Sequence, residues 1–135
     1  MNRVELKKEL IRDEGLKLKA YKDSVGIMTI GCGHNLEQPI TEAAAMAILD
    51  DDISTVEAGL DRAFPWWRGL SEVRQRVMVN LGFNLGIVRL MGFKRTLEAM
   101  QDGDFTLAAN EMLESKWATQ VGQRARRLAS MMRSG

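Results

Sequence analysis

Four side chains near the start of the chain could do chemistry together: Glu14, Asp23, Thr29 and His34. Glycoside hydrolysis needs one carboxyl group that stays protonated, so that it can give its proton to the leaving oxygen. It needs a second carboxylate that stays ionised to stabilise positive charge or activate water. We therefore expect a hydrolytic site if the fold gathers these side chains in one cleft.

The two carboxylates differ in their predicted surroundings. Glu14 falls in the last turn of a helix, where the negative end of the helix dipole disfavours a charged carboxylate. Asp23 falls in a turn and remains solvated, which favours its ionised form. Glu14 is thus the natural acid. Since acidic residues are common at helix ends and turns, this pattern taken by itself is equally typical of two solvated side chains.

The segment before residue 40 predicts a helix followed by a hairpin. Asn2 can cap the helix and Gly15 can end it. Two short strand-like runs, 20–22 and 27–30, flank the turn 23–26. We expect Thr29 and His34 to lie on the returning strand.

The rest of the chain predicts helices. Thr41 and Ser71 are typical caps of two of them, and the second is expected to be interrupted at 82–86. Further helical segments are predicted near 105–114 and 123–132. The expected buried stripe of the helix after Thr41 comprises Met46, Ile48, Leu49, Ile53, Val56 and Leu60. The predicted fold class is α+β, mostly helical, with a small β-hairpin lobe.

Composition indicates one globular domain. The chain has 135 residues, of which 45% are hydrophobic and 27% charged. The sequence shows neither an apolar membrane span nor a signal-peptide core. The single Cys32 excludes an internal disulfide, and its position after Gly31 predicts a buried structural thiol. The net charge of +1 combines an acidic stretch over 37–61 with a basic end over 116–133.

Residues 10–36, LIRDEGLKLKAYKDSVGIMTIGCGHNL, resemble the catalytic segment of the T-even-type phage lysozymes and related endolysins. The family pattern has an acid in D-E-G, an aspartate in Y-K-D and a threonine in T-I-G-x-G-H, matched here by Glu14, Asp23 and Thr29. The resemblance continues at GFNLG (82–86), SKW (115–117) and QRARR (123–127). An ordered set of motifs is far more specific than any one of them.

The resemblance implies a single lysozyme domain over 1–135. A small lobe at about 15–40 would join a helical lobe at about 41–135, which would include the N-terminal helix, with the active cleft between the lobes. Relative to the family pattern, about twenty residues are missing between His34 and Thr41, so the small lobe and its sugar subsites should be reduced.

The resemblance also implies roles for individual residues. Glu14 would be the acid, Asp23 the second carboxylate and Thr29 the hydroxyl that positions the attacking water. Arg124 and Asn84 would lie close to the acid. Three positions would line the cleft: Phe83, Asn35 and Val121. His34 would form an ion pair with Asp52 on the following helix.

The implied activity is hydrolysis of the β-1,4 bond between N-acetylmuramic acid and N-acetylglucosamine in peptidoglycan, with no metal or cofactor. We expect a monomer that binds glycan strands, neither binding nucleic acid nor inserting stably into membranes. It would be made in the host cytoplasm without a signal peptide and lyse the cell wall after release. The alternatives are a lytic transglycosylase and an inactive wall-binding or tail-assembly module. A nucleic-acid-binding domain is a further one, although the basic end lacks interleaved aromatic residues.

Overall fold

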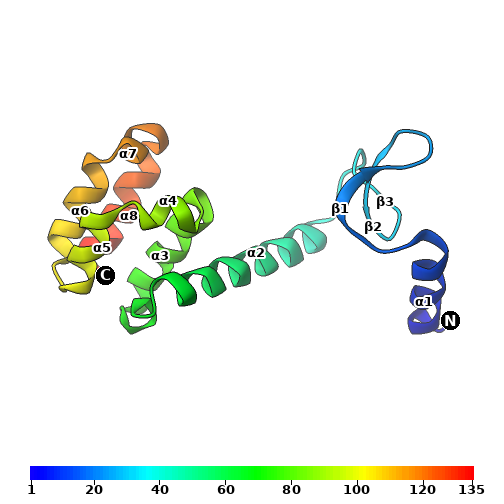
Figure 1. Ribbon diagram of the computed structural model, residues 1–135, viewed down its shortest axis with the longest axis horizontal. Coiled ribbons are helices and arrows are strands. Elements are labelled where there is room, and N and C mark those ends of the chain that lie inside the picture. Colours follow the sequence, from blue (N-terminus) through cyan, green and yellow to red (C-terminus); the bar gives the residue numbers. More distant parts are fainter. The chain divides into compact units, whose positions relative to one another are not determined.

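The computed structural model describes all residues from Met1 to Gly135 and divides into two compact units (Figure 1). The N-terminal unit comprises Met1–Ala45 and the helical unit Met46–Gly135. The assignment of the N-terminal helix to a helical lobe, and a cleft between lobes, stay predictions.

The N-terminal unit begins with helix α1 (Arg3–Glu14), as predicted. The Asn2 side chain accepts a hydrogen bond from the Glu5 backbone N–H at 3.1 Å. The helix ends at Gly15, whose φ of 82° is readily adopted only by glycine and whose N–H donates to Ile11 O at 2.8 Å. This cap places Glu14 at the last helical position.

A three-stranded antiparallel sheet follows α1, in the order β1-β2-β3. The strands are β1 (Lys17–Lys22), β2 (Met28–Gly31) and β3 (His34–Asn35). The predicted hairpin is confirmed as the β1–β2 pair.

Two expectations for the end of the hairpin are wrong. His34 lies on a third strand, because Gly31 and Gly33, at φ 69° and 67°, reverse the chain after β2. Cys32 lies in that reversal and is exposed instead of buried.

Helix α2 (Glu42–Ala63) begins after Thr41, whose hydroxyl accepts from the Ala44 N–H at 3.1 Å. Only the later part of its predicted apolar stripe packs on the core of the helical unit, with Leu60 fully buried and Val56 partly buried. Met46, Ile48 and Leu49 are exposed. None of the helices is long and apolar enough to cross a membrane.

The remaining elements form the body of the helical unit. They are η1 (Trp67–Gly69), α3 (Glu72–Leu85), α4 (Ile87–Met91), α5 (Lys94–Gln101), α6 (Phe105–Glu114), α7 (Lys116–Val121) and α8 (Gln123–Ser134). Ser71 caps α3 as predicted, its hydroxyl accepting from the Arg74 N–H. The interruption expected at 82–86 is confined to Gly86, since α3 continues to Leu85 and α4 begins at Ile87. Gly82 lies inside the helix, and a Cβ at this position would come within 2.8 Å of Val56 Cγ1 on α2, so the packing there favours glycine.

The core of the molecule lies in the helical unit. Helix α6 packs against α5 and α8, and α3 packs against α8 (Figure 1). The largest fully buried side chains are Trp67, Leu60, Met78, Leu81, Leu90, Met100, Met112, Met132 and Val77. The Arg74 guanidinium lies 3.6 Å from the centre of the Phe105 ring and donates to the carbonyls of Met132 and Arg133. It thereby satisfies carbonyl groups at the C-terminal end of α8.

Candidate active site and its supporting residues

Glu14 lies against the β2–β3 reversal of the N-terminal unit. A Cβ added to Gly33 would be 3.3 Å from Glu14 Oε2 and 3.5 Å from Cδ. The carboxyl group therefore rests on a backbone position that has no side chain. The end of α1 and the turn between β2 and β3 together fix where this carboxyl group sits.

Asp23 is held by its own turn. Its Oδ1 accepts hydrogen bonds from the backbone N–H groups of Val25 and Ile27, both at 2.9 Å. Its backbone N–H also donates to Ile27 O at 2.9 Å. Such a turn fixes the carboxylate through one oxygen and leaves Oδ2 available to a reactant.

Thr29 is the one residue that the N-terminal unit buries, with 4% of its surface exposed. It lies opposite Tyr21 on β1 and Asn35 on β3. Its hydroxyl donates to Ile27 O at 2.9 Å. Because the hydroxyl proton is committed there, the oxygen faces any reactant as an acceptor.

Asn35 has a structural hydrogen bond in addition to its predicted place in the cleft. Its side-chain oxygen accepts from the Glu37 N–H at 2.8 Å, at the turn that follows β3. Glu14, Asp23, Thr29 and Asn35 thus all belong to the N-terminal unit, where they lie at the end of α1, in the β1–β2 turn, on β2 and on β3.

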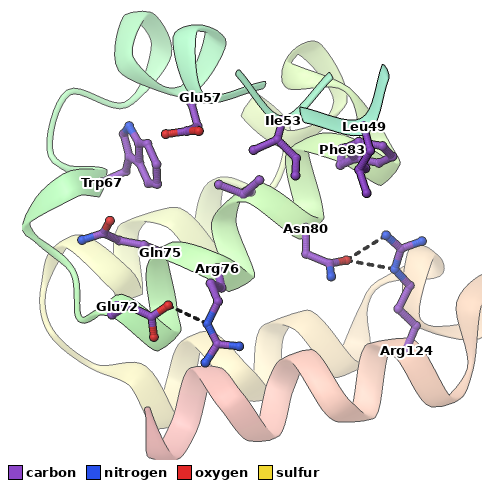
Figure 2. Close-up of a pocket in the computed structure, with 11 residues that line it drawn as sticks. Leu49, Ile53, Glu57, Trp67, Glu72, Gln75, Arg76, Asn80, Phe83 and Arg124 are labelled. Carbon is purple, nitrogen blue, oxygen red and sulfur yellow. Dashed lines mark hydrogen bonds and ion pairs between the residues drawn. The ribbon is translucent and has the colours of Figure 1, made fainter. Parts of the chain in front are cut away.

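The helical unit has a pocket of about 470 Å³ between α2, η1, α3 and the start of α8 (Figure 2). Leu49, Ile53 and Phe83 give it an apolar wall, and Arg124 lies at one end. Two of the residues predicted near the cleft, Phe83 and Arg124, are thus brought together.

The sequence did not point to Asn80, which holds Arg124. Its Oδ1 accepts from Arg124 Nε at 3.0 Å and from Nη2 at 2.8 Å (Figure 2). Asn80 lies one turn before Asn84 on the same helix face, but nothing local in the sequence pairs it with Arg124, which is 44 positions away.

Asn84 and Val121 have other surroundings. Asn84 Oδ1 accepts the indole N–H of Trp117 at 2.7 Å, and Trp117 is buried. Val121, the last residue of α7, is half-buried against the core. Asn84 therefore fixes a core tryptophan, which is a role that the sequence did not predict.

The expected partners of Glu14 and His34 belong to the other unit. Glu14 and His34 lie in Met1–Ala45, whereas Arg124 and Asp52 lie in Met46–Gly135. Both pairings stay predictions. No group of three or more His, Cys, Asp or Glu side chains is arranged to hold a metal ion.

Residues 12–133 match the family model for phage lysozyme. The chain belongs to the phage lysozyme family. It is accordingly a peptidoglycan-lytic enzyme by family, with a fold of the lysozyme-like α+β class.

Three relatives illustrate the range of the family. A probable T4-type lysozyme from Dictyostelium discoideum is 26% identical over 160 aligned residues, covering 96% of this chain and 94% of the relative. An endolysin of Acyrthosiphon pisum secondary endosymbiont phage 1 is 32% identical, and the alignment covers 79% of this chain and 73% of the endolysin. The pre-baseplate central spike protein Gp5 of Enterobacteria phage T4 is 27% identical, covering 93% of this chain but 27% of its own length. The alignment of 160 positions exceeds the 135 residues here, so the Dictyostelium relative has residues that this chain lacks.

Proposed function

We propose that the protein hydrolyses the β-1,4 bond between N-acetylmuramic acid and N-acetylglucosamine in peptidoglycan. One observation carries this proposal. In the N-terminal unit of this member of the phage lysozyme family, Glu14 lies against Gly33, and backbone groups hold both Asp23 and Thr29. This unit combines an acid at a helix end with a second carboxylate and a hydroxyl acceptor, and these are the groups that the reaction needs.

In the proposed reaction Glu14 donates its proton to the glycosidic oxygen as the bond to the anomeric carbon breaks. A water molecule donates a hydrogen bond to Thr29 Oγ1, since the hydroxyl's own proton is held by Ile27 O. The water oxygen attacks the anomeric carbon and its proton passes to Asp23. The ionised Asp23 also stabilises positive charge on the sugar ring in the transition state.

The helical unit supports this site in the proposal. Arg124, held by Asn80, keeps the acid in place, and Phe83 contacts sugar. Asn35 and Val121 line the cleft, and Asn84 supports it through Trp117. His34 pairs with Asp52 and links β3 to α2.

We propose that the protein acts as a monomer on the cell wall after release from the host cytoplasm, in host lysis. The likeness to the Gp5 spike protein favours a second candidate, a lytic module carried on a phage tail. Gel filtration of the purified chain and immunodetection on purified virions would separate these two settings.

The decisive experiment compares the wild type with Glu14→Gln on purified peptidoglycan. The amide keeps the shape but has no acidic proton, so we expect activity to fall by about 100-fold or more with little change in melting temperature. Glu9→Gln, an exposed change on the same helix, is the matched control and should stay active.

Mass analysis of the products distinguishes the alternatives. New reducing ends support hydrolysis, whereas anhydro-sugar ends would identify a lytic transglycosylase. Absence of any product from the wild type would leave an inactive wall-binding module.

A further inference from the structure

The backbone of Ile27 contacts both Asp23 and Thr29. The Ile27 N–H donates to Asp23 Oδ1 at 2.9 Å. The Ile27 carbonyl oxygen accepts from the Asp23 backbone N–H and from the Thr29 hydroxyl, both at 2.9 Å. One residue without a reactive side chain therefore contacts both the second carboxylate and the hydroxyl of the candidate site.

The register of the sheet explains the contacts with Asp23. Lys22 pairs with Met28 at the end of the β1–β2 ladder, so Asp23 and Ile27 are the next facing pair. Facing residues in a hydrogen-bonded antiparallel pair exchange two N–H···O=C bonds. Here the Asp23 carbonyl accepts from the Gly26 N–H at 3.1 Å instead, and the carboxylate Oδ1 accepts the Ile27 N–H. The Asp23 carboxylate thus takes the place of a backbone carbonyl in the ladder.

The Thr29 hydroxyl is fixed by the same carbonyl group. Thr29 is 4% exposed, and its Oγ1 donates back to Ile27 O, two residues earlier. A carbonyl oxygen has two lone pairs, and those of Ile27 accept from the Asp23 N–H and from the Thr29 hydroxyl. A shift of residue 27 would therefore move both the carboxylate and the hydroxyl.

The carboxylate and the hydroxyl together suit one water molecule. Asp23 Oδ1 already accepts from the N–H groups of Val25 and Ile27, which leaves Oδ2 to accept from a reactant. The Thr29 oxygen is also an acceptor, since its own proton is committed. A water molecule can donate one proton to each of these oxygens, and its lone pairs then point away from both. The spacing of the two oxygens therefore decides where those lone pairs point.

We propose that Ile27 is a positioning residue, whose N–H and carbonyl oxygen hold Asp23 and Thr29 at the spacing that directs one water molecule at the anomeric carbon. This inference rests on the proposed function. As the water oxygen bonds to that carbon, the bond to the leaving sugar breaks, the leaving oxygen takes the Glu14 proton, and one water proton passes to Asp23. Misplacement of reacting groups by about 1 Å can cost about 100-fold in rate. Loosening residue 27 should therefore lower kcat and leave KM nearly unchanged.

A backbone ester tests the proposal, because all three contacts use backbone atoms of Ile27. Replacing Ile27 by its α-hydroxy acid turns the amide after Gly26 into an ester, which removes the N–H and keeps the side chain. The Gly26 carbonyl, which the ester weakens, accepts no hydrogen bond. Native chemical ligation between Gly31 and Cys32 assembles the full chain with its sequence unchanged. An all-amide chain assembled in the same way is the reference.

Kinetics on soluble glycan strands give the first readout. The Ile27 ester should lower kcat about tenfold at nearly constant KM. An ester at Glu5 is the matched control, since it also removes an N–H that donates to a side-chain oxygen, Asn2 Oδ1 at 3.1 Å, but at the start of α1. It should change neither constant. An Ile27 ester that lowers kcat no more than the Glu5 ester, or that changes only KM, would overturn the proposal.

Carbon-13 NMR gives a second readout, which a general loss of stability would not move. The Ile27 ester should shift the resonances of the Thr29 methyl group and of the Asp23 carboxyl carbon. An ester at Val25 removes the other N–H donor to Asp23 Oδ1 and should shift only the carboxyl carbon. A Thr29 methyl resonance that the Ile27 ester leaves unchanged, or that the Val25 ester shifts equally, would overturn the proposal.

A recombinant variant keeps the proposal testable if the ester chain does not fold. In Asp23→Ala the Ile27 N–H loses its acceptor, so its hydrogen exchange should become about tenfold faster and the Thr29 methyl resonance should shift. Glu9→Ala, an exposed change on α1, should do neither. An unchanged exchange rate or an unchanged methyl resonance in Asp23→Ala would contradict the proposal. These measurements need no substrate, so they still report on residue 27 if the wild type cleaves no glycan, which would overturn the proposed function.

Discussion

The two units of this protein use different physical means to fix their side chains. The helical unit contains all of the buried apolar core, including Leu81 and Met112 at 0% exposure. The N-terminal unit buries Thr29 alone and fixes its polar side chains through backbone hydrogen bonds and glycine turns. The candidate catalytic groups therefore lie where packing is sparse, and stability should come from the other unit.

This contrast has a consequence for mutational data. Apolar burial contributes most of the free energy of folding, whereas a turn hydrogen bond contributes about 1 kcal/mol. Substitutions in the core of the helical unit should therefore lower the free energy of unfolding, and activity should fall only because less of the protein is folded. Changes near Glu14 should lower activity with a smaller effect on stability.

The largest expected effect on stability is that of Leu81→Ala. This fully buried side chain leaves a cavity, so the free energy of unfolding should fall by about 3 kcal/mol. Chemical denaturation followed by circular dichroism measures it. Leu18→Ala, at a β1 residue that is 86% exposed, should cost less than about 0.5 kcal/mol. Similar losses at both sites would contradict the division between the units.

A smaller effect, on activity, is expected for Gly33→Ala. The new Cβ would lie 3.3 Å from Glu14 Oε2, so the carboxyl group must move, and we expect activity to fall by about tenfold. Gly31→Ala is a close control, because its φ of 69° nearly equals the 67° of Gly33 but its Cβ would meet nothing within 4 Å. If the two variants lost activity equally, backbone strain would explain the loss, and the contact between residue 33 and Glu14 would not.

The smallest expected effect concerns pH and Asp61. Hydrogen bonds from Arg68 at 2.8 Å and Trp67 Nε1 at 2.7 Å hold the pKa of Asp61 below its ordinary value of 3.8. A lowered folded pKa stabilises the protein above pH 3.8, and this contribution is lost as pH falls through the folded value. Asp61→Asn should therefore destabilise the chain at pH 7 and have less effect near pH 2.

Two further substitutions sharpen the Asp61 test. Glu72→Gln breaks an exposed pair with Arg76 and should change stability less at every pH. Asp23→Asn can keep its two backbone hydrogen bonds through the amide oxygen, so it should lower activity with little change in the free energy of unfolding at pH 7. A loss of stability after Asp61→Asn that is the same at pH 7 and pH 2 would show that the negative charge of Asp61 contributes nothing.

Local signals in the sequence were sufficient for the elements around the candidate site. Asn2, Thr41 and Ser71 were predicted to cap helices and do so, because a cap depends on residues within one turn. The end of α1 at Gly15 and the β1–β2 hairpin follow for the same reason. The family pattern then singled out Glu14, Asp23 and Thr29, whose roles stay proposals.

The sequence by itself determined which residues begin and end most helices, the α+β class and the family, since these depend on short-range spacing and ordered motifs. Only the tertiary structure shows why residue 82 inside α3 is a glycine, because a Cβ there would come within 2.8 Å of Val56 Cγ1 on α2. It also decided that Asn80 holds Arg124 and that Asn84 holds Trp117. These pairs join residues 44 and 33 positions apart. A hydrogen bond between such distant positions depends on how the helices pack, and no local pattern in the chain encodes it.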